Sequence, residues 1–220
     1  MKLSKRLNSC LDYTKGFYKL ADIGTDHAQL PIAAITKKHV SYALAIDNKK
    51  GPYEIAKKHV EISKLENKIS VILGEGLLEI DDAVDVVVIS GMGGSLIAEI
   101  LLKADLKNIR RFILQPNNDS FFVRKALMEI NYKIEDEQII SDKNKHYDLI
   151  IAKQGKEYYN NLQLTFGPIN LLNKSTIFVD QLNREIIRLK KLLDTISSLQ
   201  RITEINQEIA LLKEALKWTA

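Results

Sequence analysis

Acidic residues and glycines follow an apolar run near the start of the chain. In the stretch KLADIGTDHAQLP, residues 19–31, Asp22 lies in a short apolar segment, Gly24 ends it, and Asp26 and His27 precede a second, helix-compatible run. In α/β proteins the end of the first strand directs backbone N–H groups and one carboxylate into the crevice beside the sheet. The dinucleotide fingerprint G-x-G-x-x-G is absent, because positions 26 and 29 are Asp and Gln. We therefore expect a cationic or zwitterionic ligand, since Asp26 would repel a pyrophosphate.

Three further segments of this kind follow predicted strands. Asp47 and Asn48 follow the apolar run 41–46, at a distance from Asp22 that is typical of a strand-helix-strand unit whose second strand ends in a ribose-binding acid. Taken alone, Asp47 fits a turn aspartate equally well. Gly74-Glu75-Gly76 follows the run 69–73, and Gly91-Met92-Gly93-Gly94 follows the β-branched run 85–90. Glycines are entropically costly, so the three in Gly91-Met92-Gly93-Gly94 predict a loop whose backbone lies against another group, rather than a flexible loop with no role.

Parallel strands alternating with helices would bring these segments to one edge of a sheet. After a first helix over residues 2–14, we predict strands at 19–23, 41–46, 69–73, 85–90 and 111–115, with helices at about 28–38, 52–63, 95–102 and 120–130. Ser95 is the expected cap of the helix at 95–102. Residues 132–140 and 147–153 predict two more strands joined by a polar turn. This is an α/β layout with a seven-stranded, mostly parallel sheet, typical of Rossmann-like methyltransferases that use S-adenosylmethionine.

The end of the chain has a different pattern. Gly167-Pro168 marks the predicted boundary between a Rossmann-like domain at 1–166 and a helical domain at 167–220. Apolar residues repeat at intervals of three and four over 182–196 and again over 202–216, and the phase slips between the two series. Both an antiparallel helical hairpin, or coiled coil, and one long helix with a stammer explain the slip.

Composition and charge narrow the class of protein. Hydrophobic residues make up 45% and charged residues 27% of the 220 residues, and no apolar run approaches the roughly 20 residues of a membrane span. The start, MKLSKRLNSC, lacks the apolar core of a signal peptide, so we expect a cytoplasmic protein. Cys10 is the only cysteine, which excludes an internal disulfide and a cysteine-based zinc cluster, and we expect no metal. The net charge of +4 permits a polyanionic partner without requiring one.

Six short segments together carry a family resemblance. They are Arg6-Leu7, Ala21-Asp22-Ile23-Gly24-Thr25-Asp26-His27-Ala28 with Leu30-Pro31, Gly51-Pro52-Tyr53, Gly74-Glu75-Gly76-Leu77, Gly91-Met92-Gly93-Gly94, and Leu114-Gln115-Pro116-Asn117. In this order and spacing the chain closely resembles the bacterial tRNA (adenine-22-N1)-methyltransferase family over nearly its whole length. The resemblance implies a Rossmann-like catalytic domain, S-adenosylmethionine as methyl donor, and N1 of an adenine in the D-arm of tRNA as acceptor.

The residues at the strand ends match the parts of such a donor. Asp22 and Asp26 suit its positive charge, and Gly24 would let backbone amides reach its methionine carboxylate. Asp47 would bind the ribose hydroxyls, and Glu75 would meet the adenine edge. The expected cofactor-binding residues are Asp22, Gly24, Asp26, His27, Asp47, Asn48, Gly74, Glu75, Gly76, Gly91, Met92 and Gly93.

A site that methylates adenine N1 must also bind the adenine base. Adenine N1 lies on the Watson–Crick edge, so the enzyme must expose the base. Gln115 and Asn117 are expected to hydrogen-bond the exposed edge, and Asp26 to orient N6 or accept a proton from it. His27 either pins the loop or contacts the substrate. Methyl transfer is an in-line displacement that positioning can accelerate, so no strong base is required.

Substrate tRNA is expected to be recognised by shape and phosphate contacts. The candidate contacts are Lys2, Lys5, Arg6, Lys37, Lys38, Lys57 and Lys58, with basic residues of the tail as a clamp. A monomer is expected rather than a dimer. Two alternatives stay open: a methyltransferase of the same fold that acts on another RNA position or a small molecule, and a non-catalytic RNA-binding protein of this fold.

Overall fold

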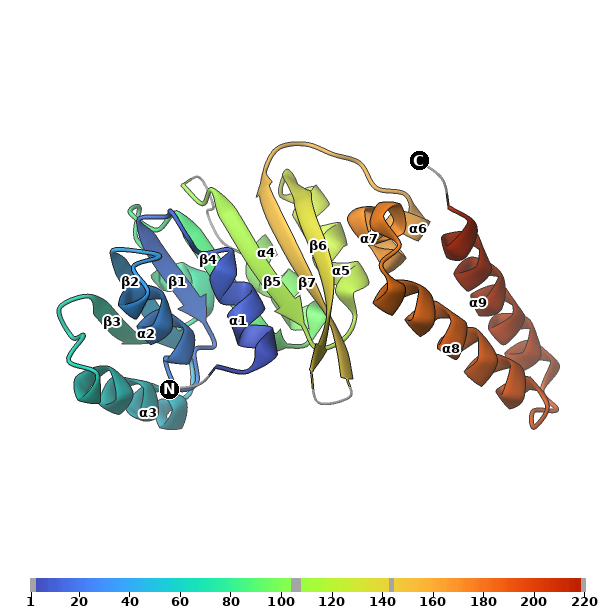
Figure 1. Ribbon diagram of the computed structural model, residues 1–220, viewed down its shortest axis with the longest axis horizontal. Helices are drawn as coiled ribbons and strands as arrows, with labels where there is room; N and C mark the ends of the chain where they lie inside the picture. The colour runs from blue at the N-terminus through green and yellow to red at the C-terminus, as the bar shows by residue number, and fades with distance from the viewer. Residues whose placement is uncertain (1–2, 104–107, 143–144, 219–220) are drawn as a thin grey trace. The chain divides into compact units, whose positions relative to one another are not determined.

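The computed structural model describes residues 3–103, 108–142 and 145–218, and these fall into two compact units, 1–158 and 159–220 (Figure 1). The division comes earlier than the predicted boundary after residue 166. The reason is local: a capping box joins Asn160 and Gln163 at the start of helix α6, Asn161–Phe166, and α6 packs on other helices of the second unit.

The first unit is built on a seven-stranded sheet. Its strands are β1 (Lys19–Ile23), β2 (Tyr42–Asp47), β3 (Ile69–Leu73), β4 (Val86–Met92), β5 (Arg111–Pro116), β6 (Tyr132–Asp142) and β7 (Lys145–Gln154). They lie in the order β3-β2-β1-β4-β5-β7-β6, and β7 runs antiparallel to both of its neighbours. The predicted Rossmann-like sheet is therefore confirmed. The carboxyl ends of β1 to β5 lie at one edge of the sheet, which is the lower edge in Figure 1.

Helices cover both faces of this sheet. They are α1 (Lys5–Asp12), α2 (Gln29–Thr36), α3 (Lys50–Ile62), α4 (Gly94–Leu102) and α5 (Ser120–Glu129), with a 3-10 turn at Gly76–Glu79. Helices α1, α2 and α3 share one hydrophobic core with alternate residues of the strands, whereas α4 and α5 pack together on the opposite face (Figure 1). Residues Val86 to Ile89 of β4 are fully buried, as expected for a central strand covered on both sides.

The structure of the glycine-rich stretch 91–94 differs from the prediction. We expected a loop at 91–94 followed by a helix with Ser95 as its cap, but β4 continues through a bulge to Met92, Gly93 takes the cap position, and α4 starts at Gly94. The backbone N–H of Gly94 donates to Asn118 O at 3.1 Å, and a Cβ at position 94 would stand 2.6 Å from that same oxygen. Glycine is required because the start of α4 packs directly on the backbone of the β5–α5 loop.

The second unit is helical. It contains α6, α7 (Pro168–Asn173), α8 (Thr176–Leu193) and α9 (Leu199–Lys217), and α8 and α9 form an antiparallel hairpin (Figure 1). Of the two explanations for the phase slip, the hairpin is correct. Lys174 Nζ ties the start of the hairpin to its end, since it donates to Leu216 O and Trp218 O. None of the helices in the described ranges is long and apolar enough to cross a membrane.

Candidate functional site

A cavity of about 670 Å³ opens at the carboxyl ends of β1 to β4. This volume lies within the range of about 300–1,000 Å³ that is usual for small-molecule sites. Its lining includes nine of the twelve residues predicted to bind a cofactor: Gly24, Asp26, Asp47, Asn48, Gly74, Glu75, Gly76, Gly91 and Met92. The structure thus brings together segments that are distant in the sequence, as the strand order requires.

Asp47 is held in a fixed orientation at the end of β2. Its Oδ1 accepts a hydrogen bond from Lys49 N at 3.0 Å, and its Oδ2 faces Asp26 N at 3.4 Å. The residue is largely buried yet lines the cavity, so its remaining lone pairs can accept hydrogen bonds from a diol. The bond from Lys49 N is that of a turn aspartate, and the position of Asp47 in the cavity lining is that of a ligand contact, so the structure is compatible with both interpretations.

Gly24 has a positive φ of 72°, and its backbone N–H is paired with the neighbouring strand. The N–H groups of Gly24 and Thr25 both donate to Ile46 O, at 2.8 and 3.1 Å, because the hydrogen bonding to β2 continues past the end of β1. In this arrangement neither of these two amides is free to bind a carboxylate, so a backbone amide that reaches the methionine carboxylate has to come from another residue. Gly24 instead gives the loop room beside Met92.

A second cavity, of about 350 Å³, adjoins the first. Its lining residues are Ser4, Arg6, Leu7, Asp22, Gly24, Thr25, Asp26, His27, Gln29, Leu30, Ser90 and Gly91. Four residues, Gly24, Asp26, Ser90 and Gly91, line both cavities. The two spaces therefore meet between the β1–α2 loop and the end of β4, where a group bound in one can reach a group bound in the other.

Asp22 lies beneath the second cavity and is only 5% exposed. Thr25 Oγ1 donates to its Oδ2 at 2.8 Å. Burial raises the pKa of Asp22 to about 7; the hydrogen bond from Thr25 opposes this rise and the negative charge of Asp47 adds to it. A cation in the adjoining space would favour the ionised form of this carboxyl group.

His27 is held by a second histidine. Its ring stacks on that of His59 with centroids 5.4 Å apart, and His59 Nδ1 donates to His27 O at 3.0 Å. On its other side, His27 Nε2 lies 3.4 Å from Asp26 Oδ2. These contacts support a role for His27 in pinning the loop. His59 itself is half-buried against this loop.

Gln115 and Asn117 occupy different environments. Gln115 is fully buried, its Nε2 donates to Pro116 O at 2.7 Å, and it lines neither cavity. In this position Gln115 is enclosed by the protein and reaches neither of the two cavities. Asn117 is exposed and lies next to the junction of the cavities, because its Nδ2 donates to Gly91 O at 2.7 Å and its backbone N–H donates to Met92 O at 2.8 Å.

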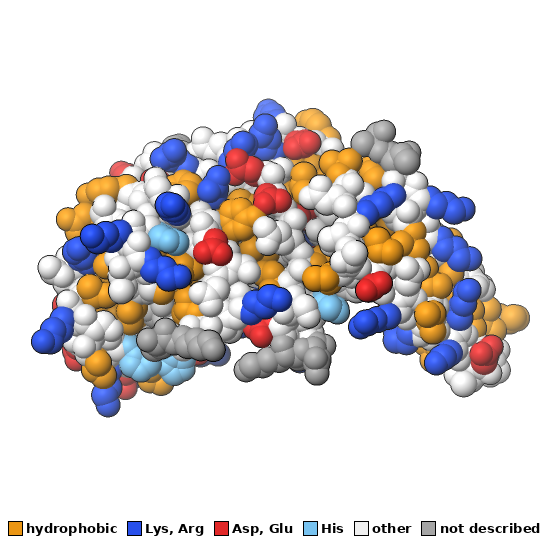
Figure 2. All heavy atoms as spheres, in the orientation of Figure 1, with side chains coloured by type: hydrophobic (Ala, Val, Ile, Leu, Met, Phe, Trp, Pro, Cys, Tyr) orange, Lys and Arg blue, Asp and Glu red, His pale blue; other side chains and the backbone are white. Residues whose placement is uncertain are grey.

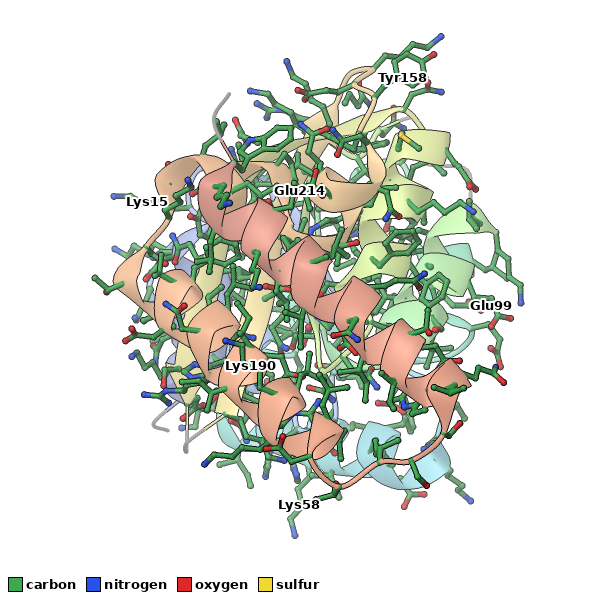
Figure 3. All side chains as sticks on the ribbon, turned by 90° about the vertical axis from the view of Figure 1, so that its right-hand side faces the viewer. Lys15, Lys58, Glu99, Tyr158, Lys190 and Glu214 are labelled. Atoms are coloured by element: carbon green, nitrogen blue, oxygen red, sulfur yellow. The ribbon has the colours of Figure 1, made fainter. Side chains whose placement is uncertain are left out.

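The basic residues predicted to bind tRNA divide between two edges of the first unit. Lys57 and Lys58 precede His59 on α3, beside the loop that lines both cavities. Lys37 and Lys38 follow α2 at the opposite edge, just before the start of β2. Lys5 is exposed on the first turn of α1, next to Arg6, whereas Lys2 lies outside the described residues. Figure 3 shows Lys58 at the lower end of the molecule, well below Lys15, which follows α1.

Sequence reasoning missed part of the first cavity. Its outer wall contains Leu77, Leu78, Leu96, Ile100 and Lys103, which come from the 3-10 turn and α4. Leu78 is 64% exposed and Leu96 48% exposed, although both are large and apolar. Their exposure is a structural signal of a binding wall, but the sequence shows them as ordinary apolar residues of short helices.

Comparison with known proteins shows matches over almost the whole chain. The model of the tRNA (adenine(22)-N(1))-methyltransferase family matches residues 20–215. The tRNA (adenine(22)-N(1))-methyltransferase of Bacillus subtilis is 34% identical over 232 residues, which cover 98% of each chain. A Streptococcus pneumoniae protein solved in complex with S-adenosyl-L-methionine is 32% identical with a TM-score of 0.90, over 98% of this chain and 100% of that one. M. capricolum TrmK, solved with S-adenosyl-homocysteine, is 32% identical with a TM-score of 0.89, over 99% of both chains.

Proposed function

Because the chain belongs to the tRNA (adenine(22)-N(1))-methyltransferase family, we propose that it transfers a methyl group from S-adenosylmethionine to N1 of adenine 22 in tRNA. The observation that carries this proposal is the pair of cavities that meet at Gly24 and Gly91. One is suited to the cofactor by its size and its fixed acid, Asp47. The other gives the acceptor base access to the junction.

The residues of the first cavity fit the cofactor part by part. Asp47 would accept hydrogen bonds from the ribose hydroxyls, and the segment Gly74-Glu75-Gly76 with Leu78 and Leu96, which line this cavity, would enclose the adenine ring. Asp22 and Asp26 favour the positively charged end on electrostatic grounds. S-adenosylmethionine supplies a methyl group activated by attachment to a cationic sulfur.

The chain's own residues position the reaction. A C–N bond forms with the N1 lone pair while the C–S bond breaks and its electron pair goes to sulfur, so N1 loses no proton in this step. Asn117 Oδ1 accepts a hydrogen bond from the N6 amino group, which turns N1 toward the junction beside Gly91. Asp26 stands at the same junction, where its negative charge stabilises the cationic 1-methyladenine ring. The acceleration comes from holding adenine N1, the methyl carbon and the sulfur of the donor in line.

The tRNA extends beyond this site and meets basic side chains. Lys5, Lys57 and Lys58 lie on the same side of the first unit as the cavities and are suited to phosphate contacts. In the second unit, α8 carries four exposed cations: Arg184, Arg188, Lys190 and Lys191. Figure 2 shows Lys and Arg side chains gathered over this unit, and Lys190 is labelled on α8 in Figure 3. The protein acts as a monomer in the cytoplasm, with the second unit as a tRNA clamp.

The decisive experiment measures transfer of labelled methyl from S-adenosylmethionine to an unmodified tRNA transcript with adenine at position 22. The matched substrate is the same transcript with guanine there. Incorporation into the first and not the second is expected. Equal incorporation into both would refute the target position, and incorporation without any RNA would indicate a small-molecule acceptor.

A further inference from the structure

Arg6 joins the first helix to the loop after β5 and to strands β4 and β7, beside the cavity junction. Its Nη1 donates to Asn117 Oδ1 at 3.0 Å, across 111 positions of sequence, and its guanidinium lies 5.2 Å from the centre of the Tyr147 ring. A Cβ at position 91 would stand 3.6 Å from the same Nη1, so the guanidinium also packs beside Gly91. Arg6 therefore touches elements that end or begin near β4, β5 and β7.

These contacts determine which way the Asn117 carboxamide faces. Its oxygen receives a hydrogen bond from the Arg6 cation, and its Nδ2 donates to Gly91 O at 2.7 Å. Turning the amide over would place its NH2 group against the guanidinium and its oxygen against a carbonyl oxygen. Both contacts would be repulsive, because a guanidinium only donates and a carbonyl only accepts. Arg6 thus holds Oδ1 on its own side, beside the second cavity that Arg6 lines, where the remaining lone pair of Oδ1 can accept a hydrogen bond from an N6 amino group.

The same contacts leave Arg6 poorly placed as a phosphate ligand. A guanidinium that binds phosphate usually presents two parallel N–H groups. Here one Nη is engaged with Asn117, one face lies over Tyr147, and the half-exposed side chain lines the second cavity. Lys5, one position earlier, is exposed.

We propose that Arg6 is a positioning residue, which holds the Asn117 carboxamide and the end of β4 in the geometry needed for transfer, and that it is not a tRNA phosphate contact. The proposal deepens the proposed function and rests on it. It replaces the sequence-based expectation that Arg6 binds tRNA in the same way as Lys5.

The test compares Arg6→Ala and Arg6→Lys in the full-length protein with two single-charge controls. Lys5→Ala removes an exposed charge beside the site, and Lys15→Ala removes one after the far end of α1. For each variant, kcat and KM for tRNA, the Kd for S-adenosylmethionine and the salt dependence of tRNA binding are measured. Circular dichroism and thermal melting verify that each variant is folded.

For Arg6→Ala we expect kcat to fall by about tenfold to a hundredfold, as for other losses of alignment, with the tRNA salt dependence unchanged. Arg6→Lys should not restore kcat, because an ammonium keeps the charge but loses the planar contact with Tyr147. Lys5→Ala should weaken tRNA binding and reduce the salt slope by about one, and Lys15→Ala should do neither.

A reduced salt slope in Arg6→Ala with kcat retained, and recovery in Arg6→Lys, would overturn the proposal in favour of a phosphate contact. A weaker Kd for S-adenosylmethionine with kcat retained would overturn it in favour of a cofactor contact. If the unaltered protein fails to methylate adenine 22, the proposed function itself is refuted. If the unaltered protein methylates adenine 22 and Arg6→Ala has the same kcat, only the proposed role of Arg6 is refuted.

A double-mutant cycle with Asn117→Ala tests whether Arg6 affects kcat through Asn117. If Arg6 acts through Asn117, its replacement should have little further effect on kcat once Asn117 is alanine. Multiplication of the two single effects in the double variant would show that Arg6 does not act through Asn117 and would overturn the proposal.

Discussion

The terminal methyl carbon of Met92 fills the space that a Cβ at position 24 would occupy. Gly24 follows β1 and Met92 ends β4, so this contact packs two strand ends against each other at the junction of the two cavities. The junction is therefore a closely packed surface, in which the absence of a side chain at position 24 is a steric requirement as well as a conformational one.

Replacing Gly24 with alanine should weaken S-adenosylmethionine binding. The added Cβ overlaps Met92 and the positive φ is strained for alanine, at a combined cost of about 1–3 kcal/mol. Isothermal titration calorimetry should show a Kd roughly tenfold higher or more, with partial recovery in Gly24→Ala/Met92→Ala. Gly51→Ala is the matched control, because nothing lies within 4 Å of its Cβ position. An unchanged Kd for Gly24→Ala would contradict the role of this contact.

Binding of S-adenosylmethionine should depend on pH through Asp22. Burial raises the pKa of Asp22 to about 7, so the free protein holds this carboxyl group mostly protonated below that pH. A cationic ligand favours the ionised form, and binding then releases a proton, so affinity should increase as pH rises toward 7 by up to about tenfold per unit. Titrations from about pH 5 to about pH 8 measure this slope. Asp22→Asn should bind more weakly and lose the slope, and retention of the slope would exclude Asp22 as its source.

Asp22 should also affect the stability of the protein without ligand. Because its pKa is raised on folding, the native state binds more protons than the unfolded state between the ordinary carboxyl pKa of 3.8 and about 7. The contribution of Asp22 to the free energy of unfolding is therefore fully present below 3.8 and is lost as pH rises through this interval. Urea unfolding at several pH values should show a flatter profile for Asp22→Asn. A parallel profile would disprove the assignment.

The two pairs of lysines should differ in their effect on tRNA binding. Lys57 and Lys58 lie on α3 beside the loop of the junction, whereas Lys37 and Lys38 lie at the opposite edge. Replacing both residues of a pair with alanine removes the same charge in each case. Filter binding at several salt concentrations should show weaker tRNA binding for the α3 pair only. For that pair, the slope of the logarithm of the binding constant against the logarithm of the salt concentration should be reduced by about two. Equal effects of the two pairs would indicate long-range attraction without local contacts.

Removal of the second unit should separate cofactor binding from tRNA binding. All residues that line the two cavities lie within the first 103 positions, so a chain ending at Tyr158 should bind S-adenosylmethionine with nearly normal affinity. Its tRNA affinity should fall, because α8 carries four exposed cations. Calorimetry and gel-shift assays measure the two affinities. Unchanged tRNA affinity in the shortened chain would refute the clamp.

A buried ion pair supports the α5 side of the sheet. Arg124 Nε lies 2.7 Å from Glu137 Oε1, and neither side chain is exposed. Glu137→Leu leaves a buried cation short of one partner and should lower the free energy of unfolding by about 3–5 kcal/mol. Glu129→Leu is the control, since its pair with Lys125 is half exposed and should change stability by less than about 1 kcal/mol. Urea unfolding measures both, with Glu137→Gln as the milder variant.

The order of the strands along the chain, and the acids and glycines that end them, can be read from the sequence alone. These features are local: β-branched runs such as 85–90 specify buried strands, and Asp47 or Gly74-Glu75-Gly76 stand directly after such runs. Since carboxyl ends of parallel strands share one edge, a cavity lined by these residues follows from the strand pattern alone.

Only the tertiary structure decided which polar side chains reach that cavity. Gln115 and Asn117 are two positions apart and look equivalent in sequence, yet burial of the end of β5 encloses Gln115 while Asn117 is exposed beside Gly91. Arg6 meets Asn117 because α1 packs across β5, β6 and β7. The direction of a side chain depends on contacts between segments distant in the sequence, and residue type and spacing do not contain those contacts.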